Sequence, residues 1–330
     1  MQASPWSRWL RADDRPGTPR DKVLEQRERM RMRQVGPVAL VFLLAVPAPA
    51  AARDCDRTCT LQVSDAVLSA LQTGQFGKLL PRSVRVTENG RDIRPADSQL
   101  RAFKNITYQH TFAELTGGVA GFNGAAEAYG GPALFSMRLK LKGDQVAEVE
   151  TLVVRRTEAL TFSPEPPSAE PDGDQVLPPQ GRASRADLIA ISGAWLDRLA
   201  PARATEATSC SLAENGARST SCGNVPGLRG ATLIRDRRWP LVDEARGLVW
   251  VFAMADIPAE AAPGGPANRS PRRAAHSVRM SALFRVETGQ IGAIALVLRD
   301  APPGALTGWA PPKAKKSPTP GRPSEVLDRR

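Results

Sequence analysis

The chain has few residues of the kinds that metal, phosphate and nucleic-acid sites require. Its 330 residues include 2 histidines, 2 tyrosines and 5% aromatic side chains. So few histidines argue against a Cys/His zinc site, and so few aromatics give no platform for stacked bases. The sequence also lacks a glycine-rich phosphate loop, a G-x-S-x-G nucleophile elbow and paired metal-ligand spacing. We therefore predict no metal and no cofactor.

The positive charge is concentrated at the two ends of the chain. The formal net charge is +11. Residues 1–52 hold nine Lys/Arg against five Asp/Glu, and residues 313–330 hold six against two, so each end contributes +4. The body between them carries the remaining +3, which is too little for a surface that tracks a phosphate backbone. We predict no nucleic-acid partner.

An apolar run near the start, Val38–Val46, follows arginines and ends in alanines and prolines before Arg53. The run is too short to span a bilayer, and a small-residue ending is typical of a cleaved signal peptide. We predict a signal peptide at about residues 30–52, cleavage after Ala52, and a periplasmic or secreted protein with no stable membrane span after processing. A membrane-anchored form with an uncleaved signal and a buried core helix are the alternatives.

The polar residues before this run exceed what a signal peptide needs. The true start is therefore Met1, Met30 or Met32.

A seven-residue motif occurs twice, as VRVTENG at Val84–Gly90 and CSLAENG at Cys210–Gly216. Each copy reads as a strand that ends in Asn-Gly, the strongest short signal for a type I′ hairpin turn. Further on, Arg238–Val249 can be laid over Gln109–Val119. Two copies of the same strand-and-turn pattern indicate that one small domain was built twice.

The first copy predicts a helix over about 58–73, the hairpin, a short helical turn around 98–104 and a meander of strands over 106–156. The second copy begins with a helix after Ser184, which has an apolar stripe. The stripe consists of Leu188, Ile191, Trp195, Leu196 and Leu199. The proline-rich, polar segment between the copies predicts an extended linker.

These signals predict five parts of the chain. They are an N-terminal extension with the signal peptide (1–52), a first domain (53–160), a linker (161–183), a second domain (184–300) with a loop insertion at 259–276, and a disordered basic tail (301–330).

The four cysteines all lie after the predicted cleavage site, as expected of an exported protein. They are Cys55, Cys59, Cys210 and Cys222. The simplest pairing joins Cys55 to Cys59 and Cys210 to Cys222, because each bond then closes a short loop within one repeat. Four free thiols are the alternative.

The pattern resembles the cone-shaped nuclear-transport-factor-2-like superfamily, which includes ketosteroid isomerase and the SnoaL-like polyketide cyclases. More specifically, it resembles a group of exported bacterial and fungal proteins of unknown function. The likeness is carried by Cys55–Cys59, Val84–Gly90, Gly131–Leu141 with Glu148–Arg155, and Cys210–Gly216 with Cys222 and Arg238–Gly247. It implies an α+β fold of two tandem cone-shaped domains, each with helices packed on a curved antiparallel sheet.

The resemblance also implies a general base at the end of the first strand of each copy. That position falls on Glu88 and on Glu214, and a carboxylate there acts as a base only if an apolar cone raises its pKa. The alternative is that Glu-Asn-Gly is a hairpin turn without chemistry. His110, beside Tyr108 on a strand expected to line the first cone, is the candidate proton donor. A plain sheet surface is the alternative for both residues.

The remaining ligand-binding candidates are Asn89, Asn215, Arg238 and Asp243. Arg238 and Asp243 flank Trp-Pro-Leu-Val, and their alternative role is a structural ion pair across a hairpin.

The predicted function is binding of a small, largely apolar molecule in one or both cones. The alternatives are an isomerase, dehydratase or cyclase with Glu88 or Glu214 as base, and a non-catalytic envelope scaffold. Because members of the superfamily often pair through their sheets, we expect an intrachain pseudo-dimer or a homodimer.

Overall fold

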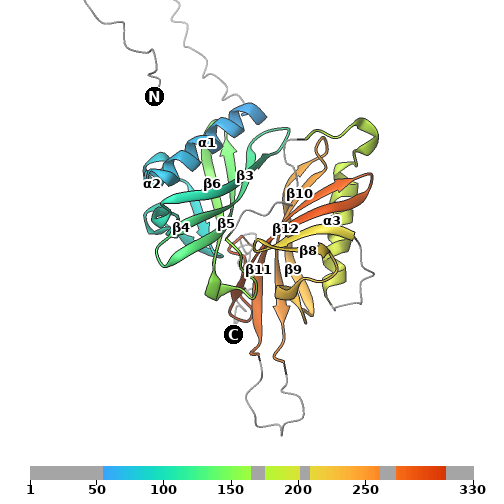
Figure 1. Ribbon diagram of the computed structural model, residues 1–330. Helices are drawn as coiled ribbons and strands as arrows, with labels where there is room; N and C mark the ends of the chain where they lie inside the picture. Colours follow the sequence, from blue (N-terminus) through green and yellow to red (C-terminus); the bar gives the residue numbers. More distant parts are fainter. Residues whose placement is uncertain (1–54, 165–174, 201–208, 261–272, 310–330) are drawn as a thin grey trace, which may run out of the picture. The chain divides into compact units, whose positions relative to one another are not determined.

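The computed structural model describes residues 55–164, 175–200, 209–260 and 273–309. These residues form two six-stranded sheets, with helices against one face of each (Figure 1). The strand orders are β2-β1-β6-β5-β4-β3 and β8-β7-β12-β11-β10-β9, so the two sheets have one topology. The predicted α+β fold of two tandem repeats is confirmed. The predicted signal peptide lies outside the described residues.

The first repeat contains two helices, two short 3₁₀ turns, one short hairpin and four long strands. These elements are α1 (Arg57–Gln72), α2 (Phe76–Leu79), β1 (Arg85–Glu88), β2 (Arg91–Ile93), η1 (Pro95–Asp97), η2 (Gln99–Ala102), β3 (Asn105–Ala113), β4 (Val119–Ala128), β5 (Gly131–Lys142) and β6 (Gln145–Arg155).

The second repeat follows the same plan after two short 3₁₀ turns. Its elements are η3 (Arg156–Glu158), η4 (Pro179–Gly181), α3 (Arg185–Leu199), β7 (Ser209–Glu214), β8 (Ala217–Ser221), η5 (Pro226–Leu228), β9 (Leu233–Asp243), β10 (Leu248–Ile257), β11 (His276–Glu287) and β12 (Gln290–Ala301).

Local sequence sets the ends of the long helices. Asp56 caps α1 by accepting a hydrogen bond from the Cys59 amide at 2.9 Å, and Gly74 follows the helix with a φ of 69°. Ser184 caps α3 by accepting from the Asp187 amide at 3.2 Å. Both helices therefore begin and end close to the predicted residues.

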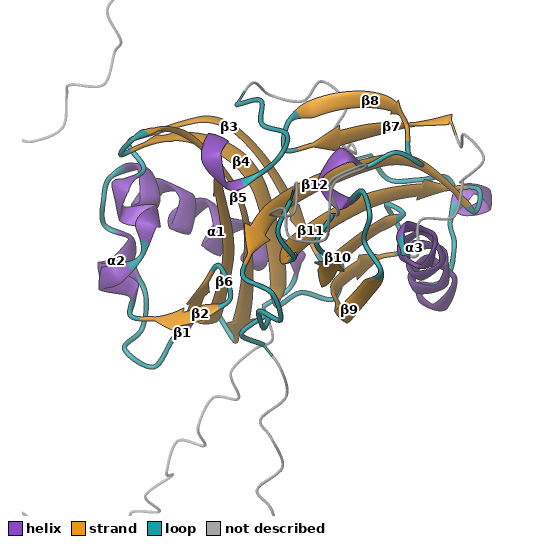
Figure 2. Ribbon diagram, turned by 90° about the horizontal axis from the view of Figure 1, so that it is seen from below, coloured by secondary structure: helices purple, strands orange, loops and turns teal. Residues whose placement is uncertain are grey.

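Each helix buries its apolar face against the inner face of its own sheet. In the first repeat the strands curve around α1 and α2 (Figure 2). The largest side chains of this core have at most 3% of their surface exposed: Leu71, Phe76, Leu100, Phe103, Phe122, Phe135, Met137 and Leu139. Trp195 and Leu196 of α3 reach the second core, where Trp195 meets Phe284 edge-on at 5.2 Å. Both cone interiors are therefore packed with apolar side chains.

The sheets are antiparallel except at one position in each. The first strand of the short hairpin runs parallel to the last strand of its repeat, so that Glu88 pairs with Thr151 and Glu214 with Leu296. The parallel pair arises because the hairpin joins the sheet beside the strand that ends the repeat. Each sheet is therefore mixed.

The opposite faces of the two sheets contact each other. Phe112 of β3 meets Trp250 of β10 edge-on, with ring centroids 4.9 Å apart. The hydroxyl oxygens of Ser136 on β5 and Ser281 on β11 lie 2.6 Å apart and are buried. A second apolar cluster joins Leu152 of β6 to Val297 of β12. The contact buries both sheet faces within one chain.

The segment that follows each sheet crosses to the Asn-Gly hairpin of the other repeat. After β6, the Ser163 amide donates to the Asn215 carbonyl oxygen at 2.8 Å. After β12, the Trp309 indole donates to the Thr87 hydroxyl at 2.6 Å, and Arg85 donates to the Gly308 carbonyl oxygen. We call residues 302–309 the C-terminal strap.

These contacts differ from the predicted linker and tail. Leu177, inside the predicted linker, is only 4% exposed, and its amide donates to the Ala245 carbonyl oxygen at 2.8 Å. The prediction of a disordered tail from residue 301 is wrong as far as Trp309, because this indole finds both a buried acceptor and cationic partners. Residues 165–174, 261–272 and 310–330 lie outside the described part, with most of the predicted loop insertion.

Candidate functional site

Glu88 ends β1 and is 6% exposed. Its carboxylate accepts hydrogen bonds from the Ser98 hydroxyl at 2.7 Å and from the Gln99 amide at 3.0 Å. Ser98 is the N-cap of η2. The Glu88 carboxylate therefore accepts hydrogen bonds at the N-terminal end of this turn, where backbone amides have no partner within the turn. Both oxygens have donors, because Gln99 also reaches the second oxygen at 3.3 Å. Glu88 therefore holds the hairpin against η2 through hydrogen bonds, which is a structural role.

Glu214 occupies the equivalent position on β7 and is 3% exposed. Its Oε1 accepts from the Thr161 hydroxyl at 2.5 Å and from the Gly227 amide at 2.9 Å. Its Oε2 is buried and has no hydrogen-bond partner among the described residues. Burial raises the pKa of the Glu214 carboxyl, and the hydrogen bonds from Thr161 and Gly227 oppose that rise. Unlike Glu88, Glu214 has a carboxylate oxygen without a donor.

The two asparagines hold the hairpins to their sheets. Asn89 and Asn215 have φ values of 51° and 45°, and each is followed by a glycine with positive φ, as the predicted type I′ turns require. The Asn89 side-chain oxygen accepts from the Val153 amide at 2.9 Å, and that of Asn215 accepts from the Leu298 amide at 2.8 Å. Both asparagine side chains therefore hydrogen-bond to the backbone of their own sheet, although both were predicted to bind ligand.

Tyr108 and His110 do not lie on the cone face of β3, and that part of the prediction is wrong. The His110 ring lies 5.5 Å from Phe112, which belongs to the cluster shared by the two sheets. Tyr108 lines a small hollow with residues of the second sheet, including Ala213 and Val297. Both residues alternate in step with Phe112 on the outer face of the strand, and a register shift between Ile106 and Tyr108 separates them from Ile106, which packs against the first core.

Arg238 and Asp243 do not pair with each other, because both lie on one strand, β9. Arg238 forms a two-pronged ion pair with Glu150 of the first sheet. Asp243 is fully buried and contacts Arg57 at 3.3 Å and Arg246 at 3.2 Å. The expected ion pair across a hairpin is therefore replaced by three ion pairs that join β9 to other parts of the chain.

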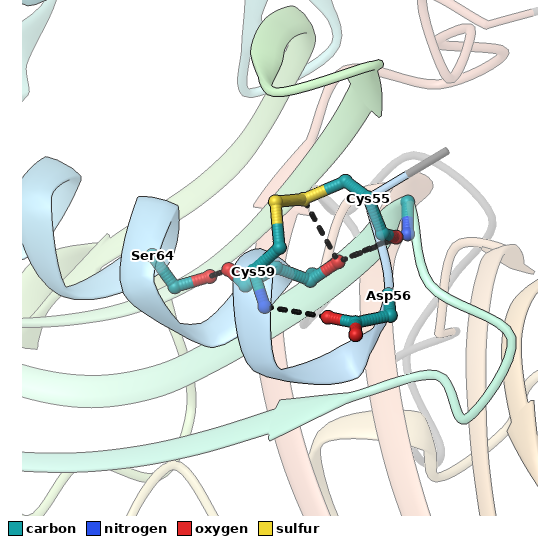
Figure 3. Close-up of a disulfide and its surroundings, with 6 residues drawn as sticks. Cys55, Asp56, Cys59 and Ser64 are labelled. Carbon is teal, nitrogen blue, oxygen red and sulfur yellow. Dashed lines mark hydrogen bonds between the residues drawn. A yellow bond between two sulfur atoms is a disulfide. The ribbon is translucent and has the colours of Figure 1, made fainter. Parts of the chain in front are cut away.

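The two predicted disulfides are present. Cys55 bonds to Cys59 and Cys210 bonds to Cys222, and no free cysteine occurs in the described part. The first bond closes over the start of α1, beside the Asp56 cap and one helical turn before Ser64 (Figure 3). Disulfides persist in oxidising compartments, so both bonds agree with an extracellular or periplasmic protein.

A large hollow among the described residues was not predicted from the sequence. Its volume is about 890 Å³, and it lies at the end of the second sheet. Its walls combine apolar residues with charged ones: Ala159, Leu160, Pro226, Arg229, Gly230, Ile257, Pro258, Ala259, Glu260, Arg273 and Asp300. We call it the second-repeat hollow. Its lining comes from five separated segments, so no single motif in the sequence marks it.

Glu214 lies directly behind the wall of the second-repeat hollow. Leu160 and Pro226 line the hollow, and the next residues along the chain, Thr161 and Gly227, donate to the Glu214 carboxylate. In each of these two segments, a residue that lines the hollow is therefore followed directly by a residue that donates to the Glu214 carboxylate.

Two features, a metal-binding cluster and a membrane-spanning helix, are absent from the described residues. No group of three or more His, Cys, Asp or Glu side chains is arranged to hold a metal ion. Within the same ranges, no helix is long and apolar enough to cross a membrane.

Residues 181–298 match the sequence profile of a domain of unknown function (DUF8021). The match covers the second repeat, about a third of the chain. No curated protein matches the chain.

Solved structures similar to this chain include one whose description names the NTF2-like superfamily. An NTF2-like protein of unknown function from Cytophaga hutchinsonii is 14% identical with a TM-score of 0.25, and the match covers 30% of this chain and 92% of that one. A steroid delta-isomerase from Pseudomonas aeruginosa is 13% identical with a TM-score of 0.25, covering 30% and 80%. PrhC from Penicillium brasilianum is 13% identical with a TM-score of 0.24, covering 30% and 82%. At these scores the likenesses carry no argument about activity.

Proposed function

We propose that this chain is an exported protein that binds a small, largely apolar molecule in the second-repeat hollow. The observation that carries the proposal is the size and lining of this hollow. A volume of about 890 Å³ lies within the range of roughly 300–1,000 Å³ typical of small-molecule sites. Apolar walls from Leu160, Pro226 and Ile257 suit an apolar body.

Charged residues at the same hollow favour a ligand that also has a polar end. Arg229 and Arg273 supply cationic groups, and Arg273 lies 3.7 Å from the Asp300 carboxylate. Among the described residues, Arg229 has no ion pair of 4.0 Å or less. An apolar molecule with one anionic group would bury its body on the walls and place its charge near Arg229.

The proposal differs from the predicted function in its location. The cone interiors are occupied by their own side chains, with Phe76, Phe122 and Phe135 fully buried in the first repeat. A ligand inside that cone would have to displace packed aromatic rings, at a cost of several kcal/mol. The hollow at the end of the second sheet requires no such displacement.

A fluorescence titration with anilinonaphthalene sulfonate (ANS) tests the proposal, because this probe has apolar rings and one anionic group. Leu160→Asp places a charge on the wall and should weaken ANS binding at least about tenfold. Leu115→Asp is the matched control, since Leu115 is 55% exposed and Leu160 is 60% exposed, but only Leu160 lines the hollow. Equal affinities for both variants would contradict the proposal.

A second candidate function is proton transfer by Glu214. The observations that favour it are the buried Oε2 without a donor and the raised pKa of the carboxyl. A base of this kind would exchange the α-proton of a hydrophobic ketone for deuterium, which proton NMR of decalone in D₂O can follow. The expected result is exchange catalysed by the wild type and by Glu88→Gln but not by Glu214→Gln. Absence of exchange in all three would leave binding as the function.

A further inference from the structure

A second, much smaller hollow lies between the two sheets. Its volume is about 20 Å³. It is lined by residues of both repeats and of the C-terminal strap: Gly90, Glu150, Thr151, Leu152, Arg238, Phe252, Ala253, Met254, Arg279, Met280 and Thr307. We propose that this hollow binds one monatomic, monovalent anion of halide size, with Arg238 and Arg279 as its donors. We call it the inter-sheet anion site.

Two hydrogen-bond donors at the inter-sheet anion site have no partner among the described residues. They are the Arg238 Nε and the Arg279 Nε, and both atoms are buried. A buried donor without an acceptor costs about 1–3 kcal/mol, and more when the donor is charged. One acceptor placed between the two would satisfy both.

The contacts of Arg238 leave its Nε for such an acceptor. Its two terminal nitrogens donate to the two oxygens of Glu150. Glu150 also accepts from Arg138 at 3.1 Å, so this single carboxylate already serves two guanidinium groups. Among the residues that line the hollow, two arginines face one glutamate, which leaves one positive charge. One uncompensated positive charge is balanced by one monovalent anion.

Arg279 has no carboxylate within 4.0 Å among the described residues. It lies directly opposite Arg299 in the β11–β12 ladder, and Arg299 pairs with Glu158 at 2.7 Å. The terminal nitrogen of Arg279 donates only to the Leu306 carbonyl oxygen, at 3.4 Å. Burial, Arg299 and Arg91 together lower the pKa of Arg279. An anion beside its Nε would offset both the burial and the repulsion.

The size of the hollow limits the ligand. A hollow of about 20 Å³ holds one water molecule or one ion of similar size, since a water needs roughly 10–15 Å³. Phosphate and sulfate are therefore excluded. A neutral water would satisfy hydrogen bonds but would leave the positive charge uncompensated, which favours chloride over water.

The first hairpin and the C-terminal strap close the site. A Cβ on Gly90 would lie 2.6 Å from the Arg279 Nε, so only glycine allows the guanidinium to reach this position. Thr307 of the strap also lines the hollow. Since groups from both repeats and from the strap surround the site, an anion there would stabilise their association.

Thermal unfolding at constant ionic strength tests this proposal. Replacing sodium gluconate stepwise by sodium chloride should raise the Tm of the wild type along a saturating curve, because an anion that binds only the folded chain stabilises it by mass action. Arg279→Gln should weaken the apparent chloride affinity by about tenfold or more. Arg185→Gln is the control, since Arg185 pairs with Glu114 away from the hollow, and should keep the wild-type response.

A crystal grown with bromide gives the second measurement and does not depend on variant stability. The expected result is a bromide anomalous peak within hydrogen-bond distance of the Arg238 Nε and the Arg279 Nε. A Tm that is indifferent to chloride, a chloride response retained by Arg279→Gln, or a crystal with water and no anomalous signal in the hollow would each overturn the proposal.

Discussion

Ser136 and Ser281 occupy equivalent positions in the two repeats, and their hydroxyl oxygens lie 2.6 Å apart where the sheets meet. Both positions are defined by register, because Ser136 faces Leu152 on β6 and Ser281 faces Val297 on β12. Ser281 also accepts a hydrogen bond from the Trp250 indole at 2.8 Å. The two repeats therefore meet about an approximate twofold axis at a buried polar contact.

Removal of either serine hydroxyl should destabilise the chain unequally. Ser136→Ala removes one hydrogen bond and should cost about 1 kcal/mol. Ser281→Ala also leaves the buried Trp250 indole without its acceptor, so it should cost about 2 kcal/mol. Urea unfolding measures both, with the exposed Ser83→Ala as control. Equal losses, or no loss for Ser281→Ala, would contradict this interpretation of the interface.

The stability of the chain should depend on pH through Glu214. Its pKa is raised above the ordinary 4.5 in the folded chain, so the unfolded chain ionises first as the pH rises. Stability from this group is therefore full below about 4.5 and falls until the pH exceeds the raised pKa. In Glu214→Gln this decline should disappear from a series of unfolding free energies measured between acidic and neutral pH.

Asp256 is a control of opposite sign. The hydrogen bond from Arg235 lowers the pKa of Asp256 below its ordinary 3.8, so its contribution is present above that value and is lost as the pH falls through the lowered pKa. Asp256→Asn should therefore change only the acidic end of the profile. An unchanged decline in Glu214→Gln would show that another group is responsible.

The contact between Gly227 and Glu214 leaves no room for a side chain. A Cβ on Gly227 would lie 2.7 Å from the Glu214 Oε1 and 3.0 Å from the Leu298 Cδ1. Gly227→Ala should displace the carboxylate and cost about 1–3 kcal/mol in urea unfolding. Gly193→Ala in α3 is the comparison, because its Cβ would meet only the Trp239 ring at 3.8 Å and should gain about 0.5–1 kcal/mol of helix propensity. Similar effects at both glycines would refute the steric argument.

The two disulfides should contribute unequally to stability. Cys210 and Cys222 are separated by 12 residues, and Cys55 and Cys59 by 4. Because a cross-link restricts the unfolded chain more when its loop is longer, removal of the Cys210–Cys222 bond should cost about 3 kcal/mol and removal of the other about 2 kcal/mol. Paired Cys→Ser variants in urea unfolding measure each loss. The reverse order would contradict the loop-length account.

The C-terminal strap should be anchored by Trp309. Its ring lies 4.0 Å from the Arg85 guanidinium and 4.7 Å from that of Arg138, and its indole donates to Thr87. Trp309→Ala should cost about 2–3 kcal/mol, and Trp309→Phe, which keeps the ring, about 1 kcal/mol. Urea unfolding of the full chain distinguishes the two. No loss in Trp309→Ala would mean that the strap does not hold the first hairpin.

Features that depend on neighbouring residues were predictable from the sequence. The Asn-Gly turns have the positive φ angles that their composition requires, and the helix caps at Asp56 and Ser184 lie where short polar side chains precede apolar periodicity. The cysteine pairing was also predictable, because each bond closes a short loop within one repeat.

Features that depend on register or on distant segments were not predictable. The comparison of Gln109–Val119 with Arg238–Val249 placed Gln109 opposite Arg238, whereas register makes His110 its counterpart: His110 pairs with Asn123, and Arg238 with Phe252. The register shift in β9 between the pairs Leu241–Trp250 and Arg238–Phe252 causes this difference, and a shift of one residue turns a side chain to the other face. The donors to Glu214 likewise come from Thr161 and Gly227, which no local pattern links to it.

Photolabelling with a diazirine-bearing decanoic acid tests the central claim, that the second-repeat hollow is the ligand site, most directly. The probe has an apolar chain and one carboxylate, and mass spectrometry of the digested, labelled protein reports where it was bound. We predict labels on peptides that contain Leu160, Pro226 or Ile257, with loss of labelling in Leu160→Asp and retention in Leu115→Asp. Labels concentrated on the cone residues Phe76 or Phe135, or labelling that Leu160→Asp leaves unchanged, would contradict the account.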